Sequence, residues 1–226
     1  MVHLIYILLD EDAKDTLHVK GETFKYLIKV RRHNEGDTIQ IRYKKEIEKL
    51  YMYNISSIEN RSLYLELVSS ELQEVKSKKA LHVGWCVIDT KSVEKVLPSL
   101  SEIGVEKITF INCDRSQKNF KIDFKRYERI LEASMQQCGR SSYVELSTCR
   151  GLNEFITQYP ETKVFDFCDN TLENGSSFET VLIGCEGGFS QNEKELLKSQ
   201  EVFRLNTPMI LRSESAVMAV ASKILL

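Results

Sequence analysis

The sequence predicts two domains: a small β-rich domain over residues 1–72 and an α/β domain with a largely parallel sheet over residues 73–226. Two observations predict this division. Up to residue 72, short segments of alternating apolar and polar residues are separated by turn residues, which is typical of strands. From about residue 80, apolar strand-like segments alternate with segments that have the 3.6-residue period of amphipathic helices. The polar stretch 71–79 (ELQEVKSKK) marks the boundary.

The first domain is predicted to be mostly strands. Residues 39 and 41, and again 63, 65 and 67, are apolar residues that share one face of a strand. Residues 21–32 are predicted to hold one short helix. Several short strands at this spacing indicate a small sheet or a barrel. The predicted strands are 2–9, 37–42, 49–58 and 62–68.

The second domain is predicted to alternate strands and helices. Asp89 or Thr90 is expected to cap a helix that ends at Gly104, a plausible left-handed C-terminal residue. Ser190 and Glu193 have the spacing of a capping box, and Ser213 is expected to cap the last helix. The other predicted elements are a helix over 123–138 and strands over 81–88, 107–112, 144–146, 163–167, 180–184 and 202–205.

Composition limits the partners of the chain. The 226 residues carry a formal net charge of −2, whereas nucleic-acid-binding proteins are often strongly basic. Any RNA site must therefore be a local basic patch. Segment 20–49 carries nine basic and five acidic residues, and segment 115–150 carries eight basic and four acidic ones. Each is thus about four charges positive, which is enough for several phosphate contacts, although a solvated charged face is the alternative interpretation.

The chain has no predicted secretory signal, membrane helix or metal site. The apolar run 4–9 has no cationic residue before it, and no apolar stretch approaches the ~20 residues that a membrane helix needs. The six cysteines form no C-x-x-C pair, and the four histidines lack metal-ligand spacing. We therefore expect a cytoplasmic protein with reduced thiols, no metal and no membrane partner.

The segment 181–190 (VLIGCEGGFS) is the first that suggests chemistry. A buried strand runs into a glycine turn and then into a capped helix, and ligands of parallel sheets bind beyond the carboxyl ends of strands. Gly187 and Gly188 would let a ligand approach the backbone closely. A turn that serves geometry alone is an equally good interpretation. The phosphate-binding G-x-x-x-x-G-K-[ST] and dinucleotide-binding G-x-G-x-x-G patterns are both absent.

The segment 204–216 (RLNTPMILRSESA) is the second that suggests chemistry. Ile210 and Leu211 are expected to be pocket walls or core. Arg212 lies just before a predicted helix N-terminus, where the helix dipole does not favour a cation. A functional role is favoured for this reason, and a surface arginine is the alternative interpretation. Glu214, in the first turn, is explained by the dipole alone.

Together these segments resemble the RsmE family of ribosomal RNA methyltransferases. G-C-E-G-G-F-S-Q-N-E and I-L-R-S-E-S-A resemble the family patterns G-P-E-G-G-F-[ST]-x-x-E and I-L-R-x-E-T-A. The likeness continues in segments 30–37, 91–105, 114–116 and 137–140. Cys185 replaces a usual proline, Asn206 a usual glycine and Ser215 a usual threonine, which indicates a divergent member.

The resemblance implies a PUA-like β-barrel followed by a SPOUT-type α/β domain with a deep trefoil knot, and a homodimer. It also implies S-adenosylmethionine as cofactor and methylation of N3 of a specific uridine in 16S ribosomal RNA of the small ribosomal subunit. Arg212 is then the candidate catalytic residue, and Arg31, Arg32, Arg115 and Arg140 are candidate RNA contacts. The candidate cofactor-binding residues are Ile183, Gly184, Glu186, Gly187, Gly188, Leu205, Asn206, Ile210 and Leu211.

Two other functions fit the same sequence. Another SPOUT enzyme, which methylates a ribose 2′-oxygen or a guanine, would share the cofactor pocket. A non-catalytic RNA-binding or ribosome-assembly factor would have a decayed pocket, and the departures at Cys185 and Asn206 leave that alternative open.

Overall fold

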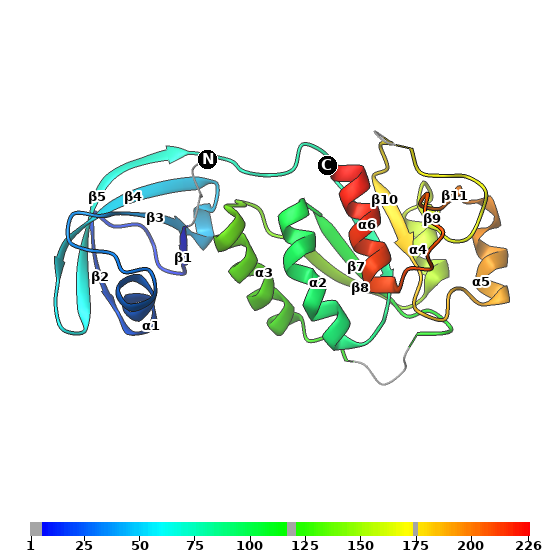
Figure 1. Cartoon of the computed structure of the whole chain (residues 1–226), viewed down its shortest axis with the longest axis horizontal. Helices are drawn as coiled ribbons and strands as arrows, with labels where there is room; N and C mark the ends of the chain where they lie inside the picture. The colour runs from blue at the N-terminus through cyan, green and yellow to red at the C-terminus, as the bar shows by residue number, and fades with distance from the viewer. Residues whose placement is uncertain (1–5, 117–120, 174–175) are drawn as a thin grey trace. The chain divides into compact units, whose positions relative to one another are not determined.

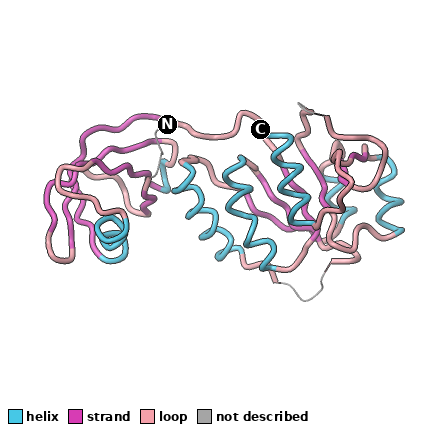
Figure 2. Tube along the Cα trace, viewed as in Figure 1, coloured by secondary structure: helices cyan, strands magenta, loops and turns pink. Residues whose placement is uncertain are grey.

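The computed structural model describes residues 6–116, 121–173 and 176–226 and divides into two compact units. The first comprises Met1–Lys76 with Met135–Ser142, and the second comprises Ser77–Ser134 with Tyr143–Leu226. Figure 2 shows the change from strands to alternating strands and helices along the chain.

The first unit contains a five-stranded sheet in the order β1-β3-β4-β5-β2. Strand β1 is parallel to β3, and the other neighbours are antiparallel. The predicted strand 2–9 is present as Ile7–Leu9, and its residues 2–5 lie outside the described residues. Strand β2 (Thr16–Lys20) was not predicted. The other elements are β3 (Thr38–Tyr43), β4 (Lys49–Ile58), β5 (Ser62–Leu72), α1 (Gly21–Lys25), the π-helix η1 (Tyr26–Val30) and the 3-10 helix η2 (Lys44–Glu46).

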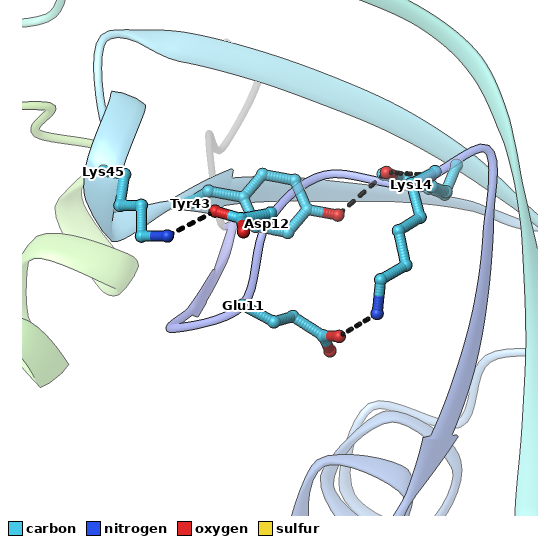
Figure 3. Close-up of polar contacts among 6 residues, drawn as sticks. Glu11, Asp12, Lys14, Tyr43 and Lys45 are labelled. Atoms are coloured by element: carbon cyan, nitrogen blue, oxygen red, sulfur yellow. Dashed lines mark hydrogen bonds and ion pairs between the residues drawn. The ribbon is translucent and has the colours of Figure 1, made fainter.

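The core of this sheet combines aliphatic residues with paired tyrosines. Ile39, Ile41, Leu63 and Leu65 are buried, as their alternation predicts. The hydroxyls of Tyr43 and Tyr53 lie 2.8 Å apart, and Tyr53 donates to the backbone carbonyl of Lys14. Two exposed ion pairs involve the connection that follows β1: Lys14–Glu11 lies within it, and Asp12 pairs with Lys45 of η2 (Figure 3). Such exposed pairs contribute little stability, so the buried tyrosine hydroxyls hold this connection more firmly.

The second unit contains a six-stranded sheet in the order β11-β9-β10-β6-β7-β8, in which all described neighbours are parallel. The order reverses direction between β6 and β10, which creates a switch point where ligands of such sheets bind. The strands are β6 (His82–Cys86), β7 (Lys107–Ile111), β8 (Glu145–Cys149), β9 (Lys163–Phe165), β10 (Thr180–Ile183) and β11 (Val202–Phe203).

Helices cover both faces of this sheet. On β6, the ring of Trp85 points to α6, as its hydrogen bond from Nε1 to Ser213 shows. The neighbouring Gly84 faces α4, since a Cβ there would lie 2.3 Å from the Phe155 ring. Successive strand residues face opposite sides, so α4 covers one face, while α6 and the adjacent α2 cover the other (Figure 1). The helices are α2 (Thr90–Ile103), α3 (Phe124–Cys138), α4 (Leu152–Gln158), α5 (Gln191–Leu196), the 3-10 helix η3 (Leu197–Ser199) and α6 (Ser213–Leu225).

Several local predictions are confirmed, two predictions are contradicted, and one helix was not predicted. Asp89 caps α2 through the amide of Ser92, and Gly104 ends it in the left-handed region. Helix α4 was not predicted, because its seven residues are too short for a clear period. Ser213 does not cap α6: the capping position is Arg212, and the Ser213 hydroxyl is used elsewhere. Cys86 and Cys113 form a disulfide, which contradicts the expected reduced state of all six thiols.

A buried polar chain crosses three strands of the sheet. His82 Nε2 lies 2.7 Å from Thr109 Oγ1, which lies 2.7 Å from Ser147 Oγ. The imidazole also packs edge-on against Phe155 and Tyr159. Burial and, to a smaller extent, the nearby Lys107 ammonium lower the pKa of His82 from 6.5 to about 4.

We predict that this histidine makes stability depend on pH between about 4 and 6.5. Above pH 6.5 the histidine is neutral in both the folded and the unfolded state, so its contribution to the free energy of unfolding is complete. As pH falls toward 4, the unfolded chain binds a proton that the folded chain does not, so the free energy of unfolding decreases. The decrease between pH 7 and 4 should be about 3 kcal/mol larger for the wild type than for His82→Gln, measured by urea unfolding. The exposed His18→Gln is the control. Equal pH slopes for the wild type and His82→Gln would contradict the prediction.

Candidate functional site

A pocket of about 940 Å³ lies at the carboxyl ends of the second unit's strands. The residues after β9 and β10, the residues after β11 and the first turn of α6 line it. Parallel strands bring these separate segments to one edge of the sheet. The lining residues are Arg115, Phe165–Phe167, Ile183–Phe189, Lys194, Arg204, Leu205, Thr207–Ser213 and Ala216.

The glycine loop (residues 184–190) forms one wall. Gly188 has φ = +64°, a left-handed conformation that favours glycine. A Cβ on Gly187 would lie 3.3 Å from the Arg115 side chain, and one on Gly184 would lie 3.3 Å from Phe189. Cys185, at the position of the family's usual proline, is buried, and burial raises the pKa of its thiol. The loop is therefore tight, and the Cys185 side chain is a small, neutral, buried group.

A buried carboxylate connects the glycine loop to the loop after β7. Glu193 Oε2 accepts from the amide of Ser190, and the Ser190 hydroxyl accepts from the amide of Glu193, which completes the predicted capping box. Glu193 Oε1 accepts from the amide of Asp114 at 2.8 Å, and the Ser190 hydroxyl donates to the Asp114 carboxylate. Arg115 Nη1 donates to the Gly187 carbonyl at 2.7 Å. Two loops about 70 residues apart in sequence are thus joined by charge-assisted hydrogen bonds.

A buried serine connects the glycine loop to α6. Trp85 Nε1 donates to Ser213 Oγ at 2.8 Å, and Ser213 Oγ donates to the Gly184 carbonyl at 2.6 Å. Ser213 is only 5% exposed, so water does not take the place of its hydroxyl in these hydrogen bonds. This chain of two hydrogen bonds fixes where α6 begins relative to the glycine loop.

The pocket lining is positive although the whole chain is negative. It contains four cationic residues, Arg115, Lys194, Arg204 and Arg212, and two acidic ones, Asp166 and Glu186. The Arg212 side chain is 80% exposed, and its closest described carboxylate is that of Glu214 at 4.0 Å. This local charge favours an anionic ligand or a nucleic acid at the pocket mouth.

The structure brings together most residues of the predicted cofactor set. Eight of the nine line the pocket, and Arg212 lies beside them. Asn206 is exposed and is not part of the lining. It does not have a positive φ, so asparagine at the family's usual glycine position causes no left-handed strain there.

The four predicted RNA contacts are divided between the two units. Arg31 and Arg32 are exposed in the first unit, and Arg115 is in the second, where its guanidinium holds the glycine loop. Arg140 is only 6% exposed, and its Nε donates to Ser142, which argues against a phosphate contact. Motif matching could not distinguish an exposed arginine from a buried one.

Sequence reasoning missed the pocket residues that follow β9. Phe165, the last residue of β9, lines the pocket with Asp166 and Phe167, and Phe167 is 78% exposed. Only the position of these residues at a strand's carboxyl end could have indicated them. Across the described parts of the chain, no three His, Cys, Asp or Glu side chains are arranged to hold a metal ion. Nor does any described helix have the length and hydropathy to cross a membrane.

Comparison with known proteins agrees with this geometry. A family model described as an RNA methyltransferase domain matches residues 75–225. A ribosomal RNA small subunit methyltransferase E from Helicobacter pylori is 38% identical over 210 residues, which cover 91% of this chain and 92% of the relative. The chain belongs to the ribosomal RNA small subunit methyltransferase E family.

Solved structures of similar proteins share the fold of this family member. A methyltransferase from Legionella pneumophila in complex with S-adenosylmethionine has a TM-score of 0.78 at 22% identity, with 99% of this chain and 97% of that chain covered. A ribosomal RNA small subunit methyltransferase E from Neisseria gonorrhoeae, bound to S-adenosyl methionine, has a TM-score of 0.75 at 17% identity, with 97% and 96% covered.

We predict that Ser213→Ala destabilises the family member's second unit. The substitution leaves the Trp85 Nε1–H and the Gly184 carbonyl without their buried partner, which costs about 1–3 kcal/mol. Urea unfolding should show this loss, while the exposed neighbour Ser215→Ala should change stability by less than about 0.5 kcal/mol. Equal effects of the two substitutions would show that the Ser213 hydroxyl has no special role.

Proposed function

We propose that this chain transfers the methyl group of S-adenosylmethionine to N3 of a specific uridine in 16S ribosomal RNA of the small ribosomal subunit. Membership of the ribosomal RNA small subunit methyltransferase E family supports the reaction class and the substrate. The observation that carries the proposal is the meeting of the glycine loop and the segment 205–213 in one positively charged pocket.

The pocket fits S-adenosylmethionine in size and in chemistry. Its volume of about 940 Å³ is at the upper end of the range for small-molecule sites. Ile183, Leu205 and Leu211 supply apolar walls for an adenosine group, and the tight turn at Gly187 and Gly188 keeps side chains out of its way. When bound, the cofactor supplies an electrophilic methyl group on a sulfonium. These residues hold and orient it.

Arg212 is the proposed catalytic residue. N3 of uracil carries a weakly acidic proton at neutral pH. As this proton passes to solvent and N3 takes the methyl group, negative charge develops on the two carbonyl oxygens that flank N3. A fixed guanidinium beside those oxygens lowers the barrier, since each ~1.4 kcal/mol is a factor of ten in rate. The exposed Arg212 side chain lies at the pocket, where an incoming base would meet it.

The target base must leave its stack to reach the pocket, which costs a few kcal/mol. Contacts to the RNA backbone offset this cost, and the exposed Arg31 and Arg32 of the first unit are the proposed phosphate contacts. Arg115 serves first to hold the glycine loop. The proposal also includes the closed PUA-like barrel, the trefoil knot and the homodimer, which the family resemblance implies.

We predict that Arg212→Ala separates cofactor binding from catalysis. The Kd of S-adenosylmethionine, measured by calorimetry, should change by less than about threefold, because the lost group acts on the base. Methylation of small ribosomal subunits should fall by about 100-fold or more. The matched control is Lys198→Ala, another exposed cation that lies outside the pocket. If the methylation rate of Arg212→Ala stays within tenfold of the wild-type rate, Arg212 is not the catalytic residue.

The target is tested by mass spectrometry of 16S ribosomal RNA from a strain that lacks the gene. We expect the loss of one 3-methyluridine and its return when the wild-type gene, but not the Arg212→Ala gene, is supplied. The loss of a ribose 2′-O-methyl group or of a methylguanine instead would identify a different RNA methyltransferase. An unchanged modification pattern would favour a non-catalytic RNA-binding factor.

A further inference from the structure

The backbone of Arg204 is held in place beside the pocket by hydrogen bonds to a neighbouring segment. It follows β11, and its amide donates to the Asn170 carbonyl at 2.8 Å. Its carbonyl accepts from the amide of Leu172 at 2.8 Å, so Thr171 and Arg204 form a parallel bridge. With both backbone groups bonded to the same neighbouring segment, the backbone position of Arg204 is fixed before any ligand binds.

The Arg204 side chain has no partner among the described residues. Its Nε is buried and makes no hydrogen bond, and no described carboxylate lies within ion-pair distance of its guanidinium. The residue nevertheless lines the pocket. The Nε–H has lost its contact with water without gaining an acceptor, which is unfavourable.

The other cations of the pocket each have a protein partner. Arg115 donates to the Gly187 carbonyl, Lys194 lies 3.9 Å from the Asp166 carboxylate, and Arg212 lies 4.0 Å from Glu214. Arg204 therefore differs from them in having both a buried nitrogen and no partner. Among the described residues, Arg204 is thus the pocket cation whose side chain is left available to an anionic group.

We propose that the guanidinium of Arg204 binds the carboxylate of the methionyl part of the cofactor. This inference rests on the proposed function, because it assigns one group of S-adenosylmethionine to one side chain. A carboxylate matches the planar, multiply donating guanidinium. Arg204 is only partly exposed, whereas the Arg212 side chain is 80% exposed, which favours a small ligand inside the pocket over an RNA phosphate at its mouth. Leu205, the next residue, supplies an apolar wall of the same pocket.

The test compares two probes that differ in the amino-acid group that carries this carboxylate. S-adenosylhomocysteine carries the amino-acid group, and 5′-methylthioadenosine lacks it. Calorimetry on the full-length wild type and on Arg204→Gln should show a loss of about tenfold or more in affinity for S-adenosylhomocysteine. Affinity for 5′-methylthioadenosine should stay within about twofold. Lys198→Gln, an exposed cation outside the pocket, is the control and should bind both probes as the wild type does.

A second variant protects the test from misfolding. Arg204→Lys keeps the charge and loses the planar donor set, so it should show a smaller loss for S-adenosylhomocysteine and none for 5′-methylthioadenosine. Circular dichroism melting of both variants checks that they fold, and if Arg204→Gln does not fold, the comparison is made on Arg204→Lys.

Each remaining outcome counts against a specific claim. Equal losses for both probes would assign Arg204 a structural role and overturn the inference. Unchanged binding of both probes would also overturn it, and a simultaneous fall in RNA affinity would identify a phosphate as the ligand. A wild type that binds neither probe would overturn the proposed function together with this inference.

Discussion

The pocket depends on one buried hydroxyl. Ser213 accepts from the Trp85 indole in the middle of the sheet and donates to the carbonyl of Gly184, where the glycine loop begins. Since Ser213 is also the first residue of α6, the same atom sets the start of that helix. The segment 205–212 precedes this anchor directly, so its apolar walls and Arg212 take their positions from it. Removing the hydroxyl would leave two buried polar groups unmet in a closely packed core.

The glycine loop has a second anchor on its far side. Glu193 is 4% exposed, yet both of its carboxylate oxygens accept backbone amides, from Ser190 and from Asp114. A buried carboxylate is tolerable only when it is satisfied in this way. The disulfide between Cys86 and Cys113 lies next to Asp114 and joins the ends of two neighbouring strands. The loop is therefore held from α6 and from the segment after β7, and the pocket wall that it forms is pre-organised.

The cations of the pocket have different roles. Arg115 and Lys194 contact the protein and help to shape the site, whereas the exposed Arg212 remains available to a substrate. Arg204 lines the pocket and has no side-chain partner among the described residues. A chain of net charge −2 can thus offer a positive site for an anionic substrate without being basic overall.

The sequence by itself determined the elements whose signals are local. The Asp89 cap, the left-handed Gly104 and the Ser190–Glu193 capping box each involve residues within one turn, and the structure has all three. The glycine loop and the 205–213 segment were also identifiable, because their residue patterns are continuous. Only the tertiary structure decided that Ser213 bonds to Gly184 and that Arg140 is buried. It also decided that Arg204 and Phe167 share the pocket. Their partners lie far away in sequence, and a buried side chain acts according to the groups that packing places beside it.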